Sequence, residues 1–314
     1  MSTGNVTAKI ITEFVIGGFD TVQNPVGAGI AMLVIYALVM LVNAANICFI
    51  VLDKRLHQPM YILICNLALV DMLYSSSCSP TMIGALIAGA KTISYVPCFI
   101  QMFAFHLGGV MEMFAIAMMA FDRLIAISVP LRYHSILTNV RTLILAFALW
   151  IVACAFVAVL PGYAIPLPLC YSTLPYTFCD FAAVIRATCV NPNFYFNIVT
   201  IITFFLLFST FSFIFLSYLR IMFAVLKMSS KTDKKKMYST CLSHLIVVVC
   251  YYCPMFIRIV LTRLGVELTK DERHGLLIGA VLGPSLVNPF VYCFRTKEIR
   301  NKISKIFKRV EPSE

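Results

Sequence analysis

Seven charge-poor apolar runs constrain the fold of this sequence more than any other feature. Crossing the hydrocarbon core of a bilayer takes about 20 helical residues. Lipid offers no hydrogen bonds to the backbone, so only helices and closed barrels can span it. The runs lack the alternation of apolar and polar residues that barrel strands need. They cover residues 27–52, 60–90, 92–121, 142–160, 194–219, 237–257 and 275–294. The sequence therefore predicts an all-α membrane protein, a seven-transmembrane helix bundle.

Composition excludes a water-soluble fold. The chain of 314 residues is 61% hydrophobic and 12% charged, whereas a soluble domain carries about 25% charged residues. The first residues contain no basic segment followed by an apolar core, as a signal peptide would. We therefore expect the first transmembrane helix to direct insertion.

The distribution of Lys and Arg predicts an extracellular N-terminus. Of 25 such residues, seven fall on the outer side under this assignment, and the remaining 18 are cytoplasmic, in agreement with the positive-inside rule. The outer ones are Lys9, Lys91, Arg186, Arg258, Arg263, Lys270 and Arg273. The net charge of +11 is thus a topology signal and a match to anionic inner-leaflet lipid, with no nucleic-acid partner implied.

These assignments divide the chain into three parts. Residues 1–25 form an extracellular tail, which carries a glycosylation acceptor at Asn5. Residues 26–294 form the seven-transmembrane domain. Residues 295–314 form the cytoplasmic tail, in which basic residues interleave with Ile299, Ile303, Ile306 and Phe307. That spacing predicts a short amphipathic cytoplasmic helix after helix 7, lying on the inner leaflet.

Two carboxyl groups fall at membrane depth, Asp71 in the second run and Glu112 in the third. Ionisable residues are costly there and face a protein interior or a water-filled pocket. Two neighbouring carboxylates cannot both stay ionised without a cation or a shared proton. The residues leave two interpretations open: a buried monovalent-cation site, or two protonated acids bonded to neighbouring polar groups.

Polar residues also mark the cytoplasmic ends of the third and seventh runs. Asp122 and Arg123 follow Glu112 by about three helical turns. Arg123 either extends to the membrane interface or is held by Asp122 until a conformational change frees it for a partner. In the seventh run, Asn288 adds a polar group and Pro289 removes a backbone donor.

Four of the 12 cysteines lie on the outer side, where disulfides are expected. Cys98 begins the third run, and the others share the long loop between the fourth and fifth runs. A bridge from Cys98 to that loop would hold it over the bundle as a lid. Four cysteines allow three pairings, and the residues alone leave the choice open. The loop cysteines are Cys170, Cys179 and Cys189.

Several long motifs, in order along nearly the whole chain, resemble those of olfactory (odorant) receptors, a family of rhodopsin-like class A G-protein-coupled receptors. They are "LHQPMYILICNLALVD", "MAFDRLIAISVPLRYHSIL", "FCDFAAVIRATC", "KKMYSTCLSHLIVVVCYY" and "LVNPFVYCFRTKEIR". Leu124 replaces the Tyr that the family has after Asp-Arg, and Val42 replaces the Gly paired with Asn43. These departures make the chain look more like a fish receptor than a typical mammalian one.

The resemblance implies a function and several pairings. The chain would be an odorant-activated receptor, not an enzyme, in the plasma membrane of olfactory neuron cilia, activating a stimulatory G protein that raises cAMP. It implies the disulfides Cys98–Cys179 and Cys170–Cys189, and a sodium site, the sole cofactor expected, at Asp71 and Glu112. Arg123 would meet the C-terminus of the Gα subunit. The residues expected to rearrange around it are Asn288, Pro289, Tyr292, Lys236, Ser239, Thr240 and His244.

A seven-helix bundle offers a small-molecule cavity that opens outward between helices 3, 5, 6 and 7. The residues expected to line it are Met102, Phe105, His106, Gly109, Tyr252, Met255, Phe256, Ile259 and Arg263. Most are apolar and suit a hydrophobic odorant. His106 and Arg263 are the polar exceptions, and each has two interpretations. They bind a carboxylate or another polar acceptor of the ligand, or they bind protein neighbours, which for Arg263 would be Glu267 or Asp271.

Other functions are weaker alternatives on the sequence. A class A chemoreceptor for a small acid or metabolite would share the same scaffold. A seven-helix transporter could use membrane carboxylates, but internal repeats are not evident, and no Lys for a retinal Schiff base falls within 275–294. For an enzyme, no metal-type His cluster or nucleophile motif stands out.

Overall fold

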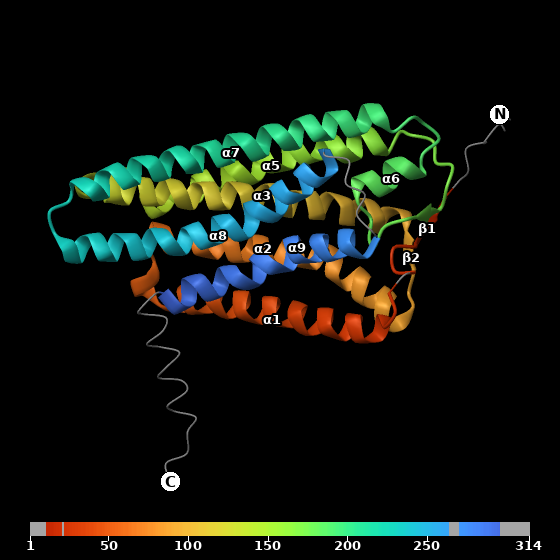
Figure 1. The fold of residues 1–314 in the computed structure, drawn as a ribbon, viewed down its shortest axis with the longest axis horizontal. Helices are drawn as coiled ribbons and strands as arrows, with labels where there is room; N and C mark the ends of the chain where they lie inside the picture. Colours follow the sequence, from red (N-terminus) through yellow and green to blue (C-terminus); the bar gives the residue numbers. More distant parts are fainter. Residues whose placement is uncertain (1–10, 21, 264–269, 296–314) are drawn as a thin grey trace, which may run out of the picture.

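The computed structural model describes residues 11–20, 22–263 and 270–295. Within them the chain forms a bundle of seven long helices that run along one axis (Figure 1). Short 3-10 turns, η1 (Lys54–Leu56) and η2 (Pro130–Arg132), and the one-turn helix α4 (Tyr133–Ile136) connect some of them. The seven are α1 (Pro25–Leu52), α2 (Pro59–Ala88), α3 (Tyr95–Ser128), α5 (Asn139–Ala164), α7 (Asn193–Lys227), α8 (Lys231–Arg263) and α9 (Lys270–Arg295). Each corresponds to one predicted run, although the second and third runs extend beyond the ends of α2 and α3.

The seven helices differ in whether their length and apolar content suffice to cross a membrane. In the described part of the chain, α1, α2, α5 and α7 are long and apolar enough to span, and α3 joins them if its 114° bend after Ser128 is counted within one span. The last two helices have shorter apolar stretches, Cys241–Ile257 and Ile278–Tyr292. Both begin in charged sequence, so these helices extend beyond their apolar segments.

Local sequence sets several helix boundaries. Asn24 caps α1 by accepting a hydrogen bond from the Gly27 N–H, and Pro25 occupies the first turn, where its missing donor costs nothing. Gly89 ends α2 in the left-handed conformation, with φ 64°, which glycine adopts without a steric penalty. The third run was expected from residue 92, but Thr92–Ser94 is a strand and α3 begins at Tyr95. The helix continues to Ser128, so Asp122 and Arg123 lie near its end, as expected.

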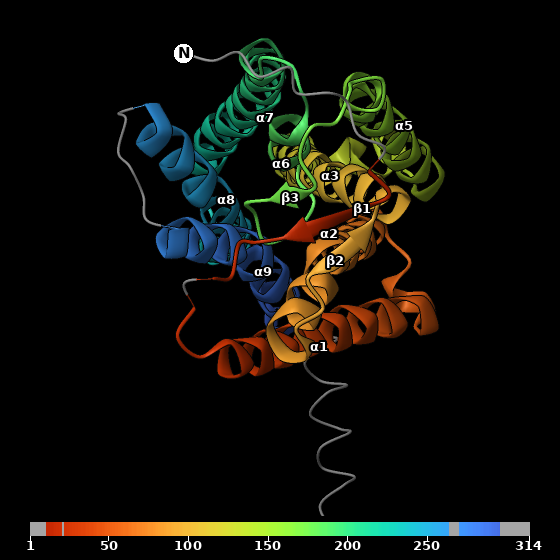
Figure 2. The ribbon, with the colours of Figure 1, turned by 90° about the vertical axis from the view of Figure 1, so that its right-hand side faces the viewer.

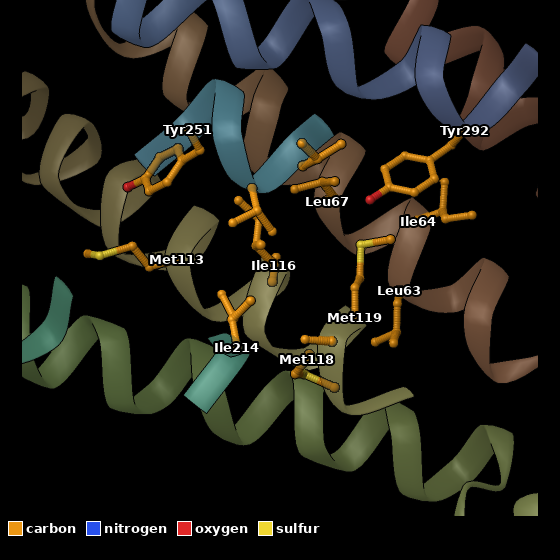
Figure 3. Close-up of a cluster of buried hydrophobic side chains, with 14 of the residues drawn as sticks. Leu63, Ile64, Leu67, Met113, Ile116, Met118, Met119, Ile214, Tyr251 and Tyr292 are labelled. Atoms are coloured by element: carbon orange, nitrogen blue, oxygen red, sulfur yellow. The ribbon is translucent and has the colours of Figure 1, made fainter. Parts of the chain in front are cut away.

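The outward faces of α1, α5 and α7 are apolar. Leu41, Phe147, Ile201 and Phe205 are each at least 63% exposed, as expected of side chains that face lipid tails. In contrast, α3 lies at the centre and contacts α2, α5, α7 and α8. Figure 3 shows the resulting core, in which Ile116 and Met119 of α3 lie among side chains of α2, α7, α8 and α9.

The outer end of the bundle carries a three-stranded sheet that the sequence analysis did not predict. Strand β1 (Glu13–Ile16) is its centre, antiparallel to β2 (Thr92–Ser94) and parallel to β3 (Thr173–Leu174). In the end-on view of Figure 2, β1 crosses the bundle between the other two. In the described part of the segment expected as a tail, backbone pairing therefore holds Glu13–Ile16 on the bundle.

Two disulfides fasten the long outer loop, in the pairing that the family resemblance implies. Cys98–Cys179 joins the start of α3 to the loop, and Cys170–Cys189 closes the loop on itself. Between Cys179 and Cys189 the loop forms the short helix α6 (Phe181–Ala187), whose side chains are largely buried. The loop is therefore a packed, cross-linked layer over the bundle rather than a free connection.

A close approach of α2 and α3 occurs at Gly108. A Cβ atom there would lie 2.8 Å from the Cα and Cβ atoms of Tyr74, closer than side-chain contacts allow. Only glycine fits without moving one helix. This contact lies one turn above Glu112 and fixes how near α2 and α3 come at the depth of the two carboxyl groups.

We expect Gly108→Ala to destabilise the bundle, because its methyl group meets a helix backbone rather than a flexible side-chain end. Overpacking of this kind costs about 1–3 kcal/mol. The measurement is the melting temperature of purified receptor in detergent. The control is Gly84→Ala in α2, where a Cβ would meet nothing within 4 Å, so that only the gain in helix propensity applies. Equal melting temperatures for the two variants would contradict the close approach.

Candidate functional site

The middle of the bundle contains a buried polar cluster built on Asp71. The amide of Asn288 in α9 donates to both oxygens of Asp71 in α2, at 3.0 and 3.2 Å. Asn43 of α1 donates to the Ser285 carbonyl, at 3.1 Å, and so joins the same region. All three side chains are 1% exposed. A hydrogen bond to a charged group contributes about 1.5–3 kcal/mol, so the cluster holds α1, α2 and α9 together.

Glu112 of α3 completes this cluster but is not satisfied by it. Its side chain is 0% exposed, and neither carboxyl oxygen has a partner of ordinary hydrogen-bond geometry. Asp71 and Asn288 are its polar neighbours. The amide oxygens of Asn43 and Asn288 are also left without a donor, and the Ser75 hydroxyl has no partner. The site thus has more acceptors than donors.

Such an oxygen-rich site fits a hard monovalent cation. Its contacting atoms would be carboxylate, amide and hydroxyl oxygens, the ligands that such ions prefer. If Glu112 were protonated, its O–H group could donate to the amide oxygen of Asn288 and relieve the same shortage of donors. In the described residues no three His, Cys, Asp or Glu side chains gather as a metal site.

At the cytoplasmic end of α3, the Asp122–Arg123 pair is formed. The two side chains lie 3.1 Å apart and are 2% and 14% exposed. Tyr133 of α4 donates to the other carboxyl oxygen of Asp122, at 2.6 Å. Burial raises the pKa of Tyr133 above its usual value, and the Asp122 charge raises it further, so this hydroxyl stays protonated. Leu124 takes no part in these contacts.

His244 of α8 links three helices just above this pair. Its Nδ1 lies 2.7 Å from the Tyr218 hydroxyl of α7, and its Nε2 lies 3.1 Å from the Ile116 carbonyl of α3. The His244 and Tyr218 rings stack nearly parallel, at 4°. Tyr292 of α9 is buried in the same core, in which Figure 3 draws it facing Ile64 and Met119. A small cavity of about 30 Å³, lined by Tyr218, Ile221, Val225 and Cys241 among others, is the size of one water molecule.

In the outer half of the bundle, the predicted ligand-binding residues of α3 contact different neighbours. Phe105 packs on Phe178 of the outer loop, with ring centroids 4.8 Å apart. His106 is paired with Asp180, at 2.9 Å, and both side chains are about a quarter exposed. Met102 is fully buried with Cys98, Phe99 and Cys179, nearer the disulfide.

The remaining predicted ligand residues lie along α8 and its neighbours. The Tyr252 hydroxyl donates to Thr210 of α7, at 2.8 Å, and its ring lies near Phe211 and Phe256. Tyr251, which was not predicted, donates to the carbonyl of Gly109, at 2.8 Å. Met255 is partly buried against the same core. The side chains of Ile259 and Arg263, and those of Lys236, Ser239 and Thr240, lie outside the described part of the structure, as does Asn5.

Sequence reasoning missed Gln101, which joins three elements. Its amide donates to the Ser77 carbonyl and the Thr81 hydroxyl of α2, at 2.8 and 2.7 Å. Its oxygen accepts from the N–H of Cys179, at 2.9 Å. A polar residue one turn into an apolar run, three positions after Cys98, was the available signal. Asp180 and Tyr133 were also missed, although both stand within motifs that carry the family resemblance.

Comparison with known proteins gives one consistent result. A family model described as "Olfactory receptor" matches residues 32–310. Olfactory receptor 6N1 of Homo sapiens is 31% identical over 99% of both chains. Olfactory receptor 2A7 of Mus musculus is 31% identical over 95% of this chain and 96% of its own. Olfactory receptor-like protein OLF3 of Canis lupus familiaris is 33% identical over 98% and 96%.

We expect Gln101→Ala to loosen the joint between α2, α3 and the outer loop. The substitution leaves the buried N–H of Cys179 without a partner, which costs about 1–3 kcal/mol. The melting temperature in detergent measures this effect. Gln23→Ala, at an exposed position before α1, is the matched control and should change little. A Gln101→Ala protein as stable as the control would show that the three hydrogen bonds do not hold the joint.

Proposed function

The chain belongs to the olfactory receptor family, and on this premise we propose how its residues bind an odorant and transmit the signal. The protein is an odorant-activated G-protein-coupled receptor of the plasma membrane, and coupling to a G protein that raises cAMP follows from the family. The observation that carries the function is the match of the olfactory receptor model over residues 32–310.

The alternative functions receive no support from the relatives. The three named above are all called olfactory receptors or olfactory receptor-like. A receptor for a small acid or metabolite and a transporter are therefore not favoured. The family is one of signalling receptors rather than enzymes.

We propose that the odorant binds between α3, α7 and α8, beneath the outer loop. Phe105, Tyr252 and Phe256 supply aromatic walls, and Met102 and Gly109 lie along the same helix as Phe105. The polar group is the His106–Asp180 pair, which favours a ligand hydroxyl or carbonyl. Because Asp180 already provides the negative charge, a ligand carboxylate would be repelled unless a cation such as Arg263 compensates it. Ile259 and Arg263 remain predicted contacts at the outer rim.

We further propose that Asp71 and Glu112 hold a sodium ion together with the oxygens of Asn288 and Ser75. The unpartnered acceptors around Glu112 support this site. A cation would hold α2, α3 and α9 in one arrangement, so ligand and ion would compete if the active arrangement separates these helices. Two protonated carboxyls remain the alternative occupant of the same space.

For the cytoplasmic switch, we propose that Asp122 and Tyr133 hold Arg123 in the resting state. Freed Arg123 would meet the Gα C-terminus while Tyr218, His244 and Tyr292 repack. Asn288 and Pro289 would allow α9 to change shape next to the sodium site. The hydrogen bond from Tyr133 to Asp122 supports this role.

We also retain the sequence-based topology as a proposal. The N-terminus is extracellular, with Asn5 glycosylated, and residues 26–294 form the receptor domain. The cytoplasmic amphipathic helix and tail predicted over 295–314, with their contact to inner-leaflet lipid, lie beyond the part of the chain that the structure describes, apart from residue 295, and stay a prediction. Expression in the cilia of olfactory neurons is the expected location.

The sodium proposal predicts an ion-specific gain in stability. Purified receptor should melt at a higher temperature in NaCl than in choline chloride of equal ionic strength, because a ligand that binds only the folded state stabilises it. Asp71→Asn should abolish the difference, whereas Asp20→Asn, at an exposed outer carboxylate, should retain it. Equal melting in the two salts for the unmodified receptor would favour protonated acids instead.

The switch proposal predicts opposite effects of two substitutions. In cells with a cAMP reporter, Arg123→Ala should abolish the response to agonists found in a broad odorant panel. Tyr133→Phe should raise basal cAMP about tenfold or more, because the resting state loses a hydrogen bond to a charged group, which contributes about 1.5–3 kcal/mol, and the equilibrium shifts accordingly. Tyr171→Phe, an exposed residue of the outer loop, is the control. Unchanged basal cAMP in Tyr133→Phe at equal surface expression would refute the restraint on Asp122.

A further inference from the structure

A row of aromatic side chains runs from the lipid-facing side of α7 to the proposed ligand site. Phe204 and Phe208 of α7 are 38% and 42% exposed, and their rings stack with centroids 4.5 Å apart. Phe208 meets Phe256 of α8 edge to face, at 5.7 Å. Phe256 in turn lies 6.2 Å from the ring of Tyr252, whose side chain is 1% exposed. This aromatic row therefore begins at the lipid and ends at one wall of the proposed site.

The aromatic row crosses from α7 to α8, two helices that contact each other little. The two are neighbours at the rim of the bundle (Figure 2), but α7 packs mainly on α3 and α8 mainly on α9. Along the row they are joined by the contacts of the Phe256 ring with Phe208 and Phe211. The hydrogen bond from Tyr252 to Thr210 lies at its inner end. Contacts between aromatic rings are individually weak, so rotation of these rings opens the row at a small cost.

The backbone of α8 is also weakened at this level. Pro254 lies inside the helix, two residues before Phe256. It cannot donate the helical hydrogen bond to the carbonyl four residues earlier, so α8 can bend here without losing a further bond. The outer end of the bundle is built differently, because two disulfides and the three-stranded sheet fasten it. The aromatic row is therefore the more easily displaced boundary of the proposed site.

We infer that apolar odorants reach the ligand site from the bilayer, between α7 and α8, and that Phe208 and Phe256 form the gate on this route. The inference rests on the ligand site proposed above and adds how that site is filled. An odorant dissolved in lipid would lie against Phe204, separate the Phe208 and Phe256 rings and continue to Tyr252. The route suits uncharged molecules that carry one hydroxyl or carbonyl, because these partition into a bilayer.

The test follows the binding kinetics of straight-chain aldehydes and alcohols, from butanal to decanal and from butanol to decanol. Full-length receptor in lipid nanodiscs carries a fluorophore at the cytoplasmic end of α8, which reports activation after rapid mixing and its loss after dilution. On the bilayer route, the association rate at a fixed aqueous concentration should rise about fourfold per methylene, as the concentration in lipid does. Association rates that stay level along the series, with affinity gained only through slower dissociation, would overturn the inference.

Substitutions at the gate give a second, independent measurement. Phe208→Ala should speed association and dissociation equally, by about two- to tenfold, because a gate alters the barrier and not the bound or free state. Phe208→Trp should slow both rates, and the dissociation constant should stay the same in both variants. Phe215→Ala, at a 54% exposed position of α7 nearer the cytoplasm, is the control and should keep both rates. If Phe208→Ala does not fold, Phe208→Leu replaces it, and unchanged rates in the Leu and Trp variants would refute the gate.

Failure of the route and failure of the ligand site are distinguishable. If Phe105→Ala or Tyr252→Phe changes the dissociation constant, but the rates depend neither on chain length nor on residue 208, the route is wrong and the ligand site stands. If neither of these two substitutions changes the dissociation constant, the ligand site is wrong, and the inferred route is wrong with it.

Discussion

The polar cluster at Asp71, enclosed in an apolar bundle, is the interaction on which the rest of the structure depends. Hydrocarbon cannot solvate a buried carboxyl group, so the helices must supply its partners. Asn288 does so from 217 residues away, and Asn43 connects the same region to α1. The close approach at Gly108 brings α3 near enough for Glu112 to join. A few polar atoms thereby fix the relative positions of helices whose other contacts are mostly non-directional.

This arrangement leaves the bundle with a shortage of donors rather than a fully satisfied network. A network in which every acceptor had a donor would hold one state strongly. Here Glu112 keeps two oxygens without partners, and in our proposal the stability of the resting arrangement depends on an exchangeable species at this site, a cation or a proton. That dependence suits a receptor, because a small ligand can shift the equilibrium between two conformations only if their free energies differ by no more than a few kcal/mol.

The helices could be predicted from the sequence because lipid enforces them: long apolar runs have no other stable form in a bilayer. The polar residues that matter were also visible, since Asp71, Glu112 and Asp122 stand out in apolar sequence. The sheet was not, because β1 is only four residues long and its partners lie near residues 93 and 173. Likewise, His106 was identified but Asp180, 74 residues away, could be paired with it only in three dimensions. The disulfide pairing required the family resemblance, since the four cysteines alone allowed three choices.

We propose that α8 connects the two ends of the bundle. Tyr251 is bound to the Gly109 carbonyl on α3, and Tyr252 to Thr210 on α7. Pro254 follows two residues later inside the helix and removes a backbone hydrogen bond there, so α8 can bend close to the aromatic walls of the proposed cavity. Two turns toward the cytoplasm, His244 binds α3 and α7 in the same way. An odorant that repacks Tyr252 would therefore act on the outer part of α8, and the inner part of the same helix carries the contacts near Arg123. To produce a G-protein signal, the ligand needs only to favour one of two packings of α8.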